Sequence, residues 1–157
     1  MLIKVIGCVL IFLGGAIAAA ALNRSLSARL KLSRSLISLI RFIRLQIDLY
    51  CLPLDEIFRR VDPRLFESLG LSSPPRSFTE LKDSLDPPPD GELRRLLESF
   101  DRELGASFRE DQLRVCDYHL AALSELCSAL DSELDKKKKL NRTLCLGAAL
   151  SIIILLI

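Results

Sequence analysis

Both ends of the chain are apolar runs bordered on their inner side by basic residues. Residues Val5 to Leu22 carry no charged side chain, and neither do Leu144 to Ile157. Lys and Arg near the ends of spanning helices favour the cytoplasmic face of a membrane. The pattern predicts a two-pass protein of the cell membrane with a cytoplasmic central domain. The bordering basic residues are Arg24, Arg29, Lys31, Arg34, Arg41 and Arg44 after the first run, and Lys136, Lys137, Lys138, Lys139 and Arg142 before the second.

The two predicted anchors differ in length. Eighteen helical residues from Val5 to Leu22 reach about 27 Å, close to the roughly 30 Å hydrocarbon core. The last fourteen residues reach only about 21 Å, unless Arg142 extends to the interface and residues 140–143 are included. We expect an anchor at 2–22, a cytoplasmic helical bundle at 23–143 and a C-terminal transmembrane segment at 144–157. A shallow, partly inserted tail is the alternative for the last segment.

A cleaved secretory signal is the alternative for the first anchor. Lys4, a short apolar core and the small residues from Ala16 to Ala21 match such a signal. The strongly basic residues beyond would resist export, and five scattered cysteines show no disulfide spacing. The sequence therefore favours a retained anchor.

Charge is segregated along the chain. All twenty acidic residues lie between Asp48 and Asp135, against ten basic residues in the same span, and the flanks hold the other twelve basic residues and no acid. Basic flanks suit an anionic membrane surface, where each basic residue contributes roughly 1 kcal/mol. An acidic centre opposes binding to phosphates, so we expect the membrane as a partner and no nucleic acid.

The sequence offers no constellation for catalysis. There is no Cys-x-x-Cys, no phosphate-binding Gly-Lys-Ser/Thr, and His119 is the one histidine. We expect His119 at the surface or half-buried on a helix, and Cys116 and Cys127 as small core residues on one helix face. We therefore predict no enzymatic activity, no catalytic, cofactor-binding or metal residues, and no cofactor; a partner must supply any energy source.

The central segment is predicted to be all-α. From Ala16 to Leu52 there is neither Gly nor Pro, so the first anchor should continue as one helix to about Tyr50. Short helices are expected at 53–61, from Pro63 to a stop at Gly70, and at 78–85. A longer helix should cover 92–104. Ser77 with Glu80, and Ser107 with Glu110, form capping-box patterns that open helices.

The last helix carries an unbroken heptad of apolar positions. The spacing alternates three and four residues, which is typical of a helix packed against a partner helix. We expect an antiparallel hairpin that aligns residues 26–47 of the first helix with 113–134 of the last. The two predicted anchors are expected to contact each other through small residues. Gly14 and Ala18 of the first should meet Ala148 and Ala149 of the second, within one chain or between subunits. The heptad positions are Leu113, Cys116, Leu120, Leu123, Cys127, Leu130 and Leu134.

Several local patterns resemble the stage III sporulation protein AB family. Leu104-Gly105, Gln112, the Leu-rich last helix, its Lys-rich end and the closing run from Ser151 to Ile157 look like that family. Ile47-x-x-Tyr50-x-x-Pro53-Leu54 resembles its exit from the first helix. The family's mid-chain Trp is missing, and Phe78 is the nearest stand-in; its glycine-rich last span is here Cys145, Gly147, Ala148 and Ala149.

The resemblance implies a function. The family's helical domain is similar to inner-membrane platform domains of type II secretion and type IV pilus systems. By that analogy the chain is a non-enzymatic membrane platform of a channel between mother cell and forespore, in the mother-cell membrane. Its partners would be other channel subunits and a cytosolic secretion-type ATPase, and self-association into a homo-oligomer is open. The alternative is a generic membrane-anchored helical scaffold or signalling accessory that tethers a cytosolic partner.

Overall fold

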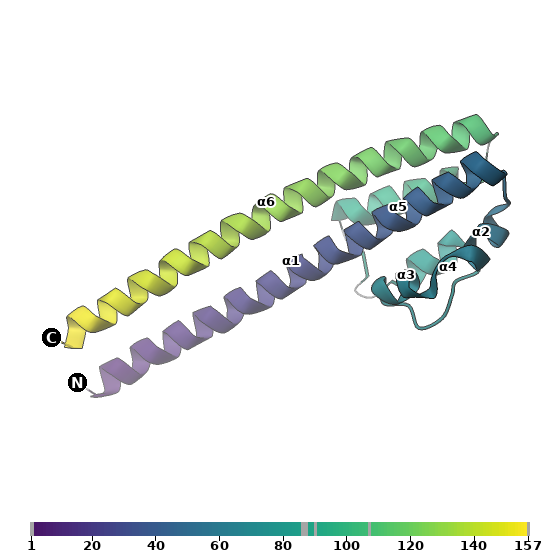
Figure 1. The fold of residues 1–157 in the computed structure, drawn as a ribbon. Coiled ribbons are helices and arrows are strands. Elements are labelled where there is room, and N and C mark those ends of the chain that lie inside the picture. The colour runs from purple at the N-terminus through teal and green to yellow at the C-terminus, as the bar shows by residue number, and fades with distance from the viewer. Residues whose placement is uncertain (1, 86–87, 90, 107, 157) are drawn as a thin grey trace. The chain divides into compact units, whose positions relative to one another are not determined.

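The computed structural model describes the backbone of residues 2–85, 88–89, 91–106 and 108–156, and the side chains of 14, 17, 20, 21, 23–85, 88–89, 91–106, 108–140 and 143. The described backbone is helical, with no strand. The chain divides into unit 1, residues 1–28 and 130–157, and unit 2, residues 29–129. Its helices are α1 (Leu2–Tyr50), α2 (Leu54–Arg60), α3 (Pro63–Ser68), α4 (Phe78–Asp83), α5 (Gly91–Glu103) and α6 (Arg109–Leu156) (Figure 1).

The boundaries follow the expected signals with small corrections. Tyr50 ends α1 as predicted, and Gly70 and Gly105 adopt positive φ after α3 and α5. The N-cap Ser77 accepts a hydrogen bond from the Glu80 amide at 3.2 Å. The return bond of the capping box goes to the amide of Arg76, which donates to Glu80 Oε2 at 2.7 Å. Helix α4 ends two residues earlier than predicted, because its C-cap Ser84 already donates to Glu80 and Leu81.

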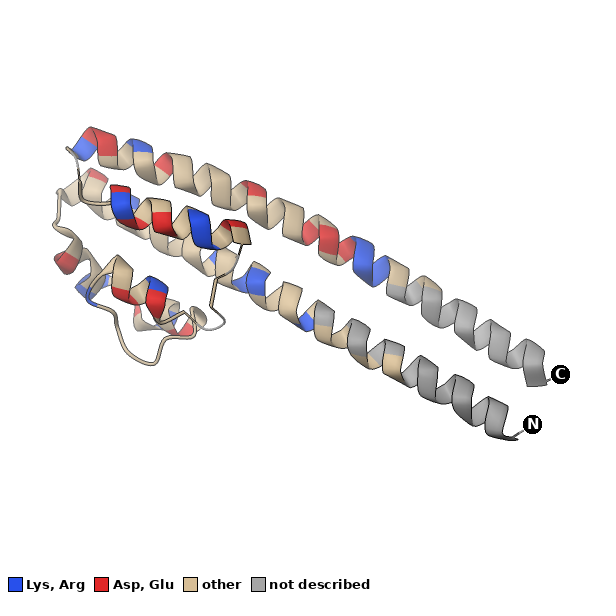
Figure 2. Ribbon diagram, turned by 180° about the vertical axis from the view of Figure 1, so that it is seen from behind, with Lys and Arg blue, Asp and Glu red and all other residues tan. Residues whose placement is uncertain are grey.

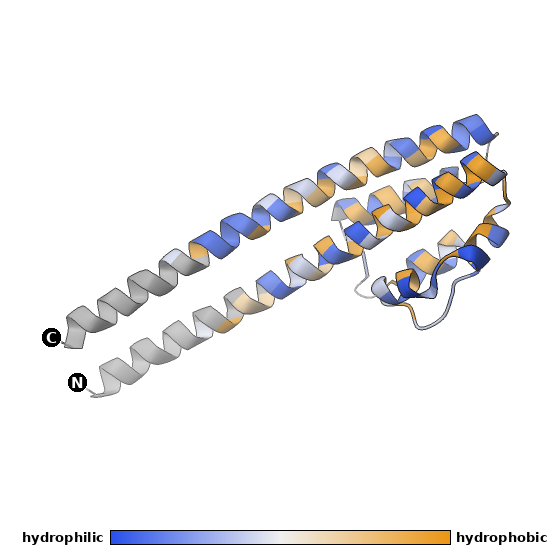
Figure 3. Ribbon diagram, viewed as in Figure 1, coloured by the Kyte–Doolittle hydropathy of each residue, from blue (hydrophilic) through white to orange (hydrophobic). Residues whose placement is uncertain are grey.

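Unit 2 contains the hydrophobic core. Inside it α1 and α6 run antiparallel, since Arg44 contacts Asp117 whereas the later Asp48 contacts the earlier Arg109. These pairs bracket the predicted alignment of Ile47 with Leu113, so the hairpin is confirmed in this unit. Apolar residues of the helices form one buried cluster. Figure 3 shows apolar and polar residues alternating along the described helices. The largest fully buried side chains are Phe100, Leu36, Leu39, Ile40, Ile43, Ile57, Leu69, Leu81, Leu97, Leu123, His119 and Cys116.

Two aromatic residues join α4 to α5. Phe78 of α4 meets Phe100 of α5 edge to face, with ring centroids 4.9 Å apart. Beside them Lys82 Nζ lies 3.0 Å from Asp101 Oδ2, and Thr79 Oγ1 donates to Asp101 Oδ1 at 2.9 Å. Such aromatic pairs stabilise by about 0.5–1.5 kcal/mol beyond their buried area. Phe78 is therefore a core residue that fastens α4 to α5.

In unit 1 the apolar heptad of α6 continues to Leu134, and the next heptad position is Lys137. Leu26, Leu130 and Leu134 are buried, while Ile17 and Leu140 are exposed. Among the residues that the structure describes, no helix offers an apolar stretch long enough for a membrane span. The side chains of the predicted 144–157 span lie outside the described residues, as do most of those at 2–22, so both anchors stay predictions.

Of the four small residues predicted to join the two anchors, the structure describes the surroundings of Gly14 alone. No described atom lies within 4 Å of the place that a Cβ would take at Gly14. Ala18, Ala148 and Ala149 have side chains outside the described part of the chain. The contact therefore remains a prediction.

Candidate docking surface at the end of α1 and the start of α6

A strained residue follows the last residue of α1. Cys51 has φ of 49° and its amide donates to the Ile47 oxygen at 3.2 Å, which is a left-handed helix cap. Glycine usually fills this position, because a side chain in the left-handed region costs roughly 1–2 kcal/mol. The cap turns the chain sharply toward α2. As a result Leu49 and Tyr50, in the last turn of α1, stay exposed by 60% and 59%.

The turn between α5 and α6 lies against the start of α2. A Cβ on Gly105 would come within 3.0 Å of Leu54 Cδ1, and Gly105 has φ of 81°. Only a glycine satisfies both conditions without strain. Phe108 follows this turn and is 89% exposed. We define the tip as Leu49, Tyr50 and Phe108.

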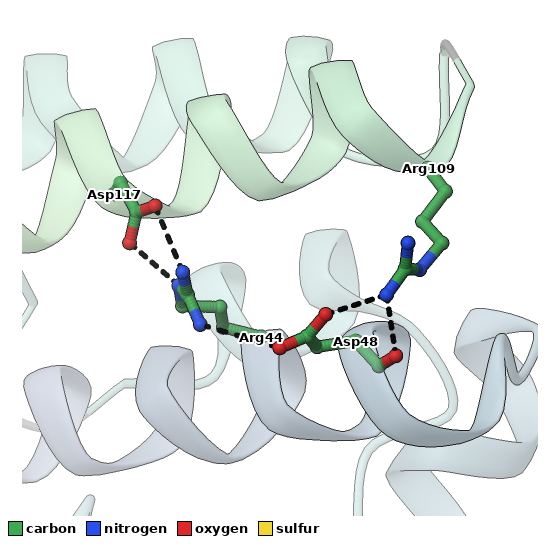
Figure 4. Close-up of polar contacts among 4 residues, drawn as sticks. All are labelled: Arg44, Asp48, Arg109 and Asp117. Atoms are coloured by element: carbon green, nitrogen blue, oxygen red, sulfur yellow. Dashed lines mark hydrogen bonds and ion pairs between the residues drawn. The ribbon is translucent and has the colours of Figure 1, made fainter.

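Arginine–carboxylate pairs hold the tip in shape (Figure 4). Arg109 Nη2 donates to the backbone oxygen of Asp48 at 2.7 Å and to its Oδ1 at 2.6 Å. One turn away, Arg44 Nε and Nη2 donate to Asp117 Oδ1 and Oδ2 at 2.5 and 3.0 Å. Arg44 Nη1 lies 3.9 Å from Asp48 Oδ2, which links the two pairs. Two arginine–carboxylate contacts thus join α1 to α6 within two helical turns. They fix the start of α6, and with it the position of Phe108 next to Arg109.

The Arg44–Asp117 pair is electrostatically favourable. The hydrogen bond to Asp117 raises the pKa of Arg44, and the same bond lowers the pKa of Asp117. Both side chains are partly exposed, so solvent screens them and such pairs contribute about 0.2–1 kcal/mol each. Their role is geometric, because a bidentate pair fixes direction as well as distance.

The exposed charges next to the tip are mostly negative. Asp55 follows Leu54 in α2, Glu103 precedes the α5–α6 turn and Glu110 follows Arg109, and all three are exposed. Of the basic residues in the same region, Arg109 and Arg114 are paired with Asp48 and Asp111, and the exposed Arg102 donates to the Glu98 backbone oxygen. The tip is therefore an apolar patch with an acidic rim.

Below the tip, His119 is fully buried, so the expectation of a surface or half-buried position was wrong. The rings of Phe100 and Tyr118 each meet the imidazole edge to face, with centroids 5.1 Å from it. Neither ring nitrogen has a hydrogen-bond partner among the described residues, and Nε2 is 3.8 Å from Glu103 Oε2. Burial lowers the pKa of His119, which keeps the imidazole neutral at pH 7.

The buried groups near His119 do not form a catalytic set. Burial raises the pKa of the Cys116 thiol to about 11, which keeps it protonated and poorly nucleophilic. Cys127, predicted on the same face, is half-buried. Among the described residues no cluster of three or more His, Cys, Asp or Glu could hold a metal ion.

A small polar cavity lies elsewhere in unit 2. It measures about 220 Å³ and is lined by the loop after α3 and by α4. Its one carboxylate, Glu80, is already engaged by the Arg76 amide. The cavity is lined by Gly70, Leu71, Ser72, Ser73, Pro75, Glu80 and Ser84.

Sequence reasoning named no site residue and missed the tip. Tyr50 was noticed only as part of a helix exit, and Phe108 gave no periodic signal because it lies outside both neighbouring helices. An exposed aromatic residue after a glycine turn was the available clue.

These features define a class: an all-helical domain with an exposed apolar patch at one end of its α1–α6 pair. The chain belongs to the stage III sporulation protein AB family, whose model matches residues 4–72 and 89–157. Membership gives the protein a role in sporulation. No curated protein and no solved structure matches the chain. Residues 73–88 lie outside the matched ranges and contain α4 and part of the polar cavity. The three residues of the tip all lie within the matched ranges.

Proposed function

We propose that this chain is a non-enzymatic membrane platform in a sporulation channel between mother cell and forespore. Its helical domain would couple a cytosolic secretion-type ATPase to the membrane subunits of the channel. Family membership supports the setting, and the exposed tip is the observation that carries the coupling role.

The anchoring part of the proposal rests on charge and exposure. Acid is confined to residues 48–135, and the flanks are basic next to uncharged runs. In unit 1 the apolar Ile17 and Leu140 are exposed, which costs free energy in water and suits contact with lipid or with another membrane subunit. Lys136 and Lys139 are exposed beside that segment, where they suit anionic headgroups.

The coupling part rests on the chemistry of the tip. Exposed aromatic side chains on a rigid frame are typical anchors of protein interfaces, because they bury much area with little loss of rotamer entropy. The acidic rim of Asp55, Glu103 and Glu110 suits a partner surface whose apolar pocket is bordered by Lys or Arg. The tip is formed by the ends of α1 and α6 that are most distant in sequence from the predicted anchors.

Binding of the ATPase to tip variants tests this proposal. Phe108→Asp should weaken binding of the full-length protein in detergent by at least about tenfold, since losing one anchor costs more than about 1–2 kcal/mol. Pro74→Asp is the matched control, an equal charge change at an exposed apolar residue of the 73–88 segment. Equal binding by both variants would favour the generic scaffold over the platform.

A further inference from the structure

The side of the α1–α6 pair that faces away from α5 is exposed in unit 2. Helix α5 covers only one side of this pair, as the two opposite views show (Figures 1 and 2). On α6, Asp117 contacts α1 and His119 contacts α5. Tyr118 lies between them in sequence, points away from both helices and is 65% exposed. Solvent therefore reaches this side of the pair.

A basic stripe runs along α1 on the same side. Arg44 contacts α6 and Ser35 contacts α3, and at about 100° per residue Leu45 points outward between them. Steps of four and three residues back from Leu45 give further positions on this side, and all of them are exposed. Three of the five positions are basic and none is acidic. The basic stripe comprises Lys31, Arg34, Ser38, Arg41 and Leu45.

The positive charge of the basic stripe is not balanced within α1. No acidic residue precedes Asp48 in the sequence, so helical neighbours three or four residues away cannot pair with Lys31 or Arg41. Neither of these two side chains forms a hydrogen bond or an ion pair with a described residue. Arg34 does have an interaction within the chain. The charge available to a partner is therefore that of Lys31 and Arg41.

Residues of α6 border the basic stripe. The two arginine–carboxylate pairs that join the helices fix their antiparallel register. This register places Tyr118 level with Arg41, and Ala121 level with Ser38. Glu125 is the one carboxylate of the combined surface, which is positive overall. We define the outer face as the basic stripe together with Arg114, Tyr118, Ala121 and Glu125 of α6.

We propose that the outer face binds an acidic amphipathic helix of another protein. The basic stripe has spacings of 3, 4, 3 and 4 residues, along which helices pack against one another. Carboxylates of the bound helix meet Lys31 and Arg41. Its apolar residues cover Leu45 and Tyr118, as in other complexes that bind an amphipathic helix. The small side chains between these anchors permit an interaxial distance of roughly 8–10 Å.

A second copy and a lipid surface fit the outer face less well. Two outer faces brought together would place like charges opposite each other, which selects against self-pairing. Helices that lie on a membrane insert an apolar face between the headgroups, whereas the apolar side of α1 is buried in the core. An acidic helix satisfies both the charge and the heptad spacing. The outer face and the tip share no residue, so binding at one does not depend on what the other binds.

Photocross-linking from Ser38 identifies the occupant. A photoreactive phenylalanine analogue at Ser38 of the full-length protein is activated in sporulating cells, and mass spectrometry identifies the cross-linked segment. We expect a segment of another protein with Asp or Glu at helical spacing. Arg41→Glu should reduce this product by at least about tenfold. Arg95→Glu, at an exposed position of α5, is the matched control and should leave it unchanged.

Four results of this experiment would overturn the proposal. They are a cross-link to a second copy, a cross-link to a phospholipid, no cross-link at all, and a product that Arg41→Glu does not reduce. Because Ser38 and Arg41 are exposed, the variants should melt like the wild type, so a lost product reports on binding.

Charge exchange with the captured segment tests the contact itself. The probe is a synthetic peptide of that segment, titrated against the full-length protein in detergent. Replacing its carboxylates by Lys should raise the dissociation constant by at least about tenfold. Combining Lys31→Glu with Arg41→Glu should restore binding of the Lys-substituted peptide. Equal binding of both peptides by the wild type, or no restoration by the double variant, would contradict the proposed contact.

Discussion

The guanidinium of Arg109 binds the C-terminal turn of α1 through Asp48. Its Nη2 lies 2.7 Å from the Asp48 backbone oxygen and 2.6 Å from Oδ1. One cation thus satisfies a carbonyl that the helix leaves unpaired and complements the negative end of the helix dipole. Because Arg109 is the first residue of α6, the same contact sets where α6 begins and how Phe108 is presented.

Replacing Arg109 should loosen the tip. Arg109→Ala is expected to lower the free energy of unfolding by about 1 kcal/mol, the scale of a partly exposed ion pair with helix-end stabilisation. Arg94→Ala, which removes the exposed Arg94–Glu98 pair within α5, should cost only a few tenths of a kcal/mol. Urea unfolding of both variants measures this, and equal stability would mean that Arg109 does not brace the tip.

A charge in the α6 heptad should unfold the bundle. Leu123 is almost completely buried, and a carboxylate in that position costs several kcal/mol against a typical domain stability of about 5–15 kcal/mol. Leu123→Asp should therefore abolish the cooperative thermal transition followed by circular dichroism. Ser124→Asp, one residue on and exposed, should melt like the wild type. Unchanged melting of Leu123→Asp would place this stripe outside the core.

His119 should make the fold sensitive to mild acid. Burial lowers its pKa, and the opposing effect of Glu103 only partly offsets this. As pH falls below about 6.5, the unfolded chain takes up a proton before the folded one. The neutral, buried His119 therefore does not reduce the free energy of unfolding above pH 6.5. As the pH falls from there toward the pKa of His119 in the folded protein, the free energy of unfolding decreases by at most about 1.4 kcal/mol per pH unit.

The His119→Gln variant isolates that effect. Its unfolding free energy should change less between pH 7.5 and 5.5 than that of the wild type. The carboxylates and the Arg44–Asp117 pair are the same in both proteins, so they cancel in the comparison. An identical pH dependence would show that His119 is protonated equally in the folded and unfolded states.

The long helices were predictable and the burial of His119 was not. The absence of Gly and Pro from Ala16 to Leu52 predicts the long helix α1. The unbroken heptad predicts α6 and its antiparallel pairing with α1. His119 lies beside the heptad stripe rather than in it, so its burial depends on Phe100 of α5. The packing of α5 on one side of α6 is a feature of the tertiary structure. The helical periodicity of α6 does not predict which side α5 covers.

The tip escaped prediction for a related reason. Leu49 and Tyr50 look like the continuation of a buried stripe, and their exposure follows from the left-handed cap at Cys51. Phe108 becomes conspicuous only when Gly105 folds the preceding turn against Leu54. Patches of this kind arise from loops that meet in space, whereas sequence patterns report single elements.

Membrane orientation is the next prediction. The basic borders predict that Asp90 faces the cytoplasm and that Ile157 lies on the other side. Reporter fusions at the two positions, active on opposite sides of the membrane, should give opposite signals. An externally accessible position 90 would reverse the orientation and remove the tip from any cytosolic ATPase.

The most direct test of the platform account is site-specific photocross-linking at Phe108 in sporulating cells. A photoreactive phenylalanine analogue at Phe108, which is 89% exposed, should cross-link the full-length protein to the secretion-type ATPase. The same analogue at Glu92, on α5, is the control and should not. Cross-linking to the ATPase from position 92 but not from 108, or from neither, would contradict the claim that the tip couples it to the membrane subunits.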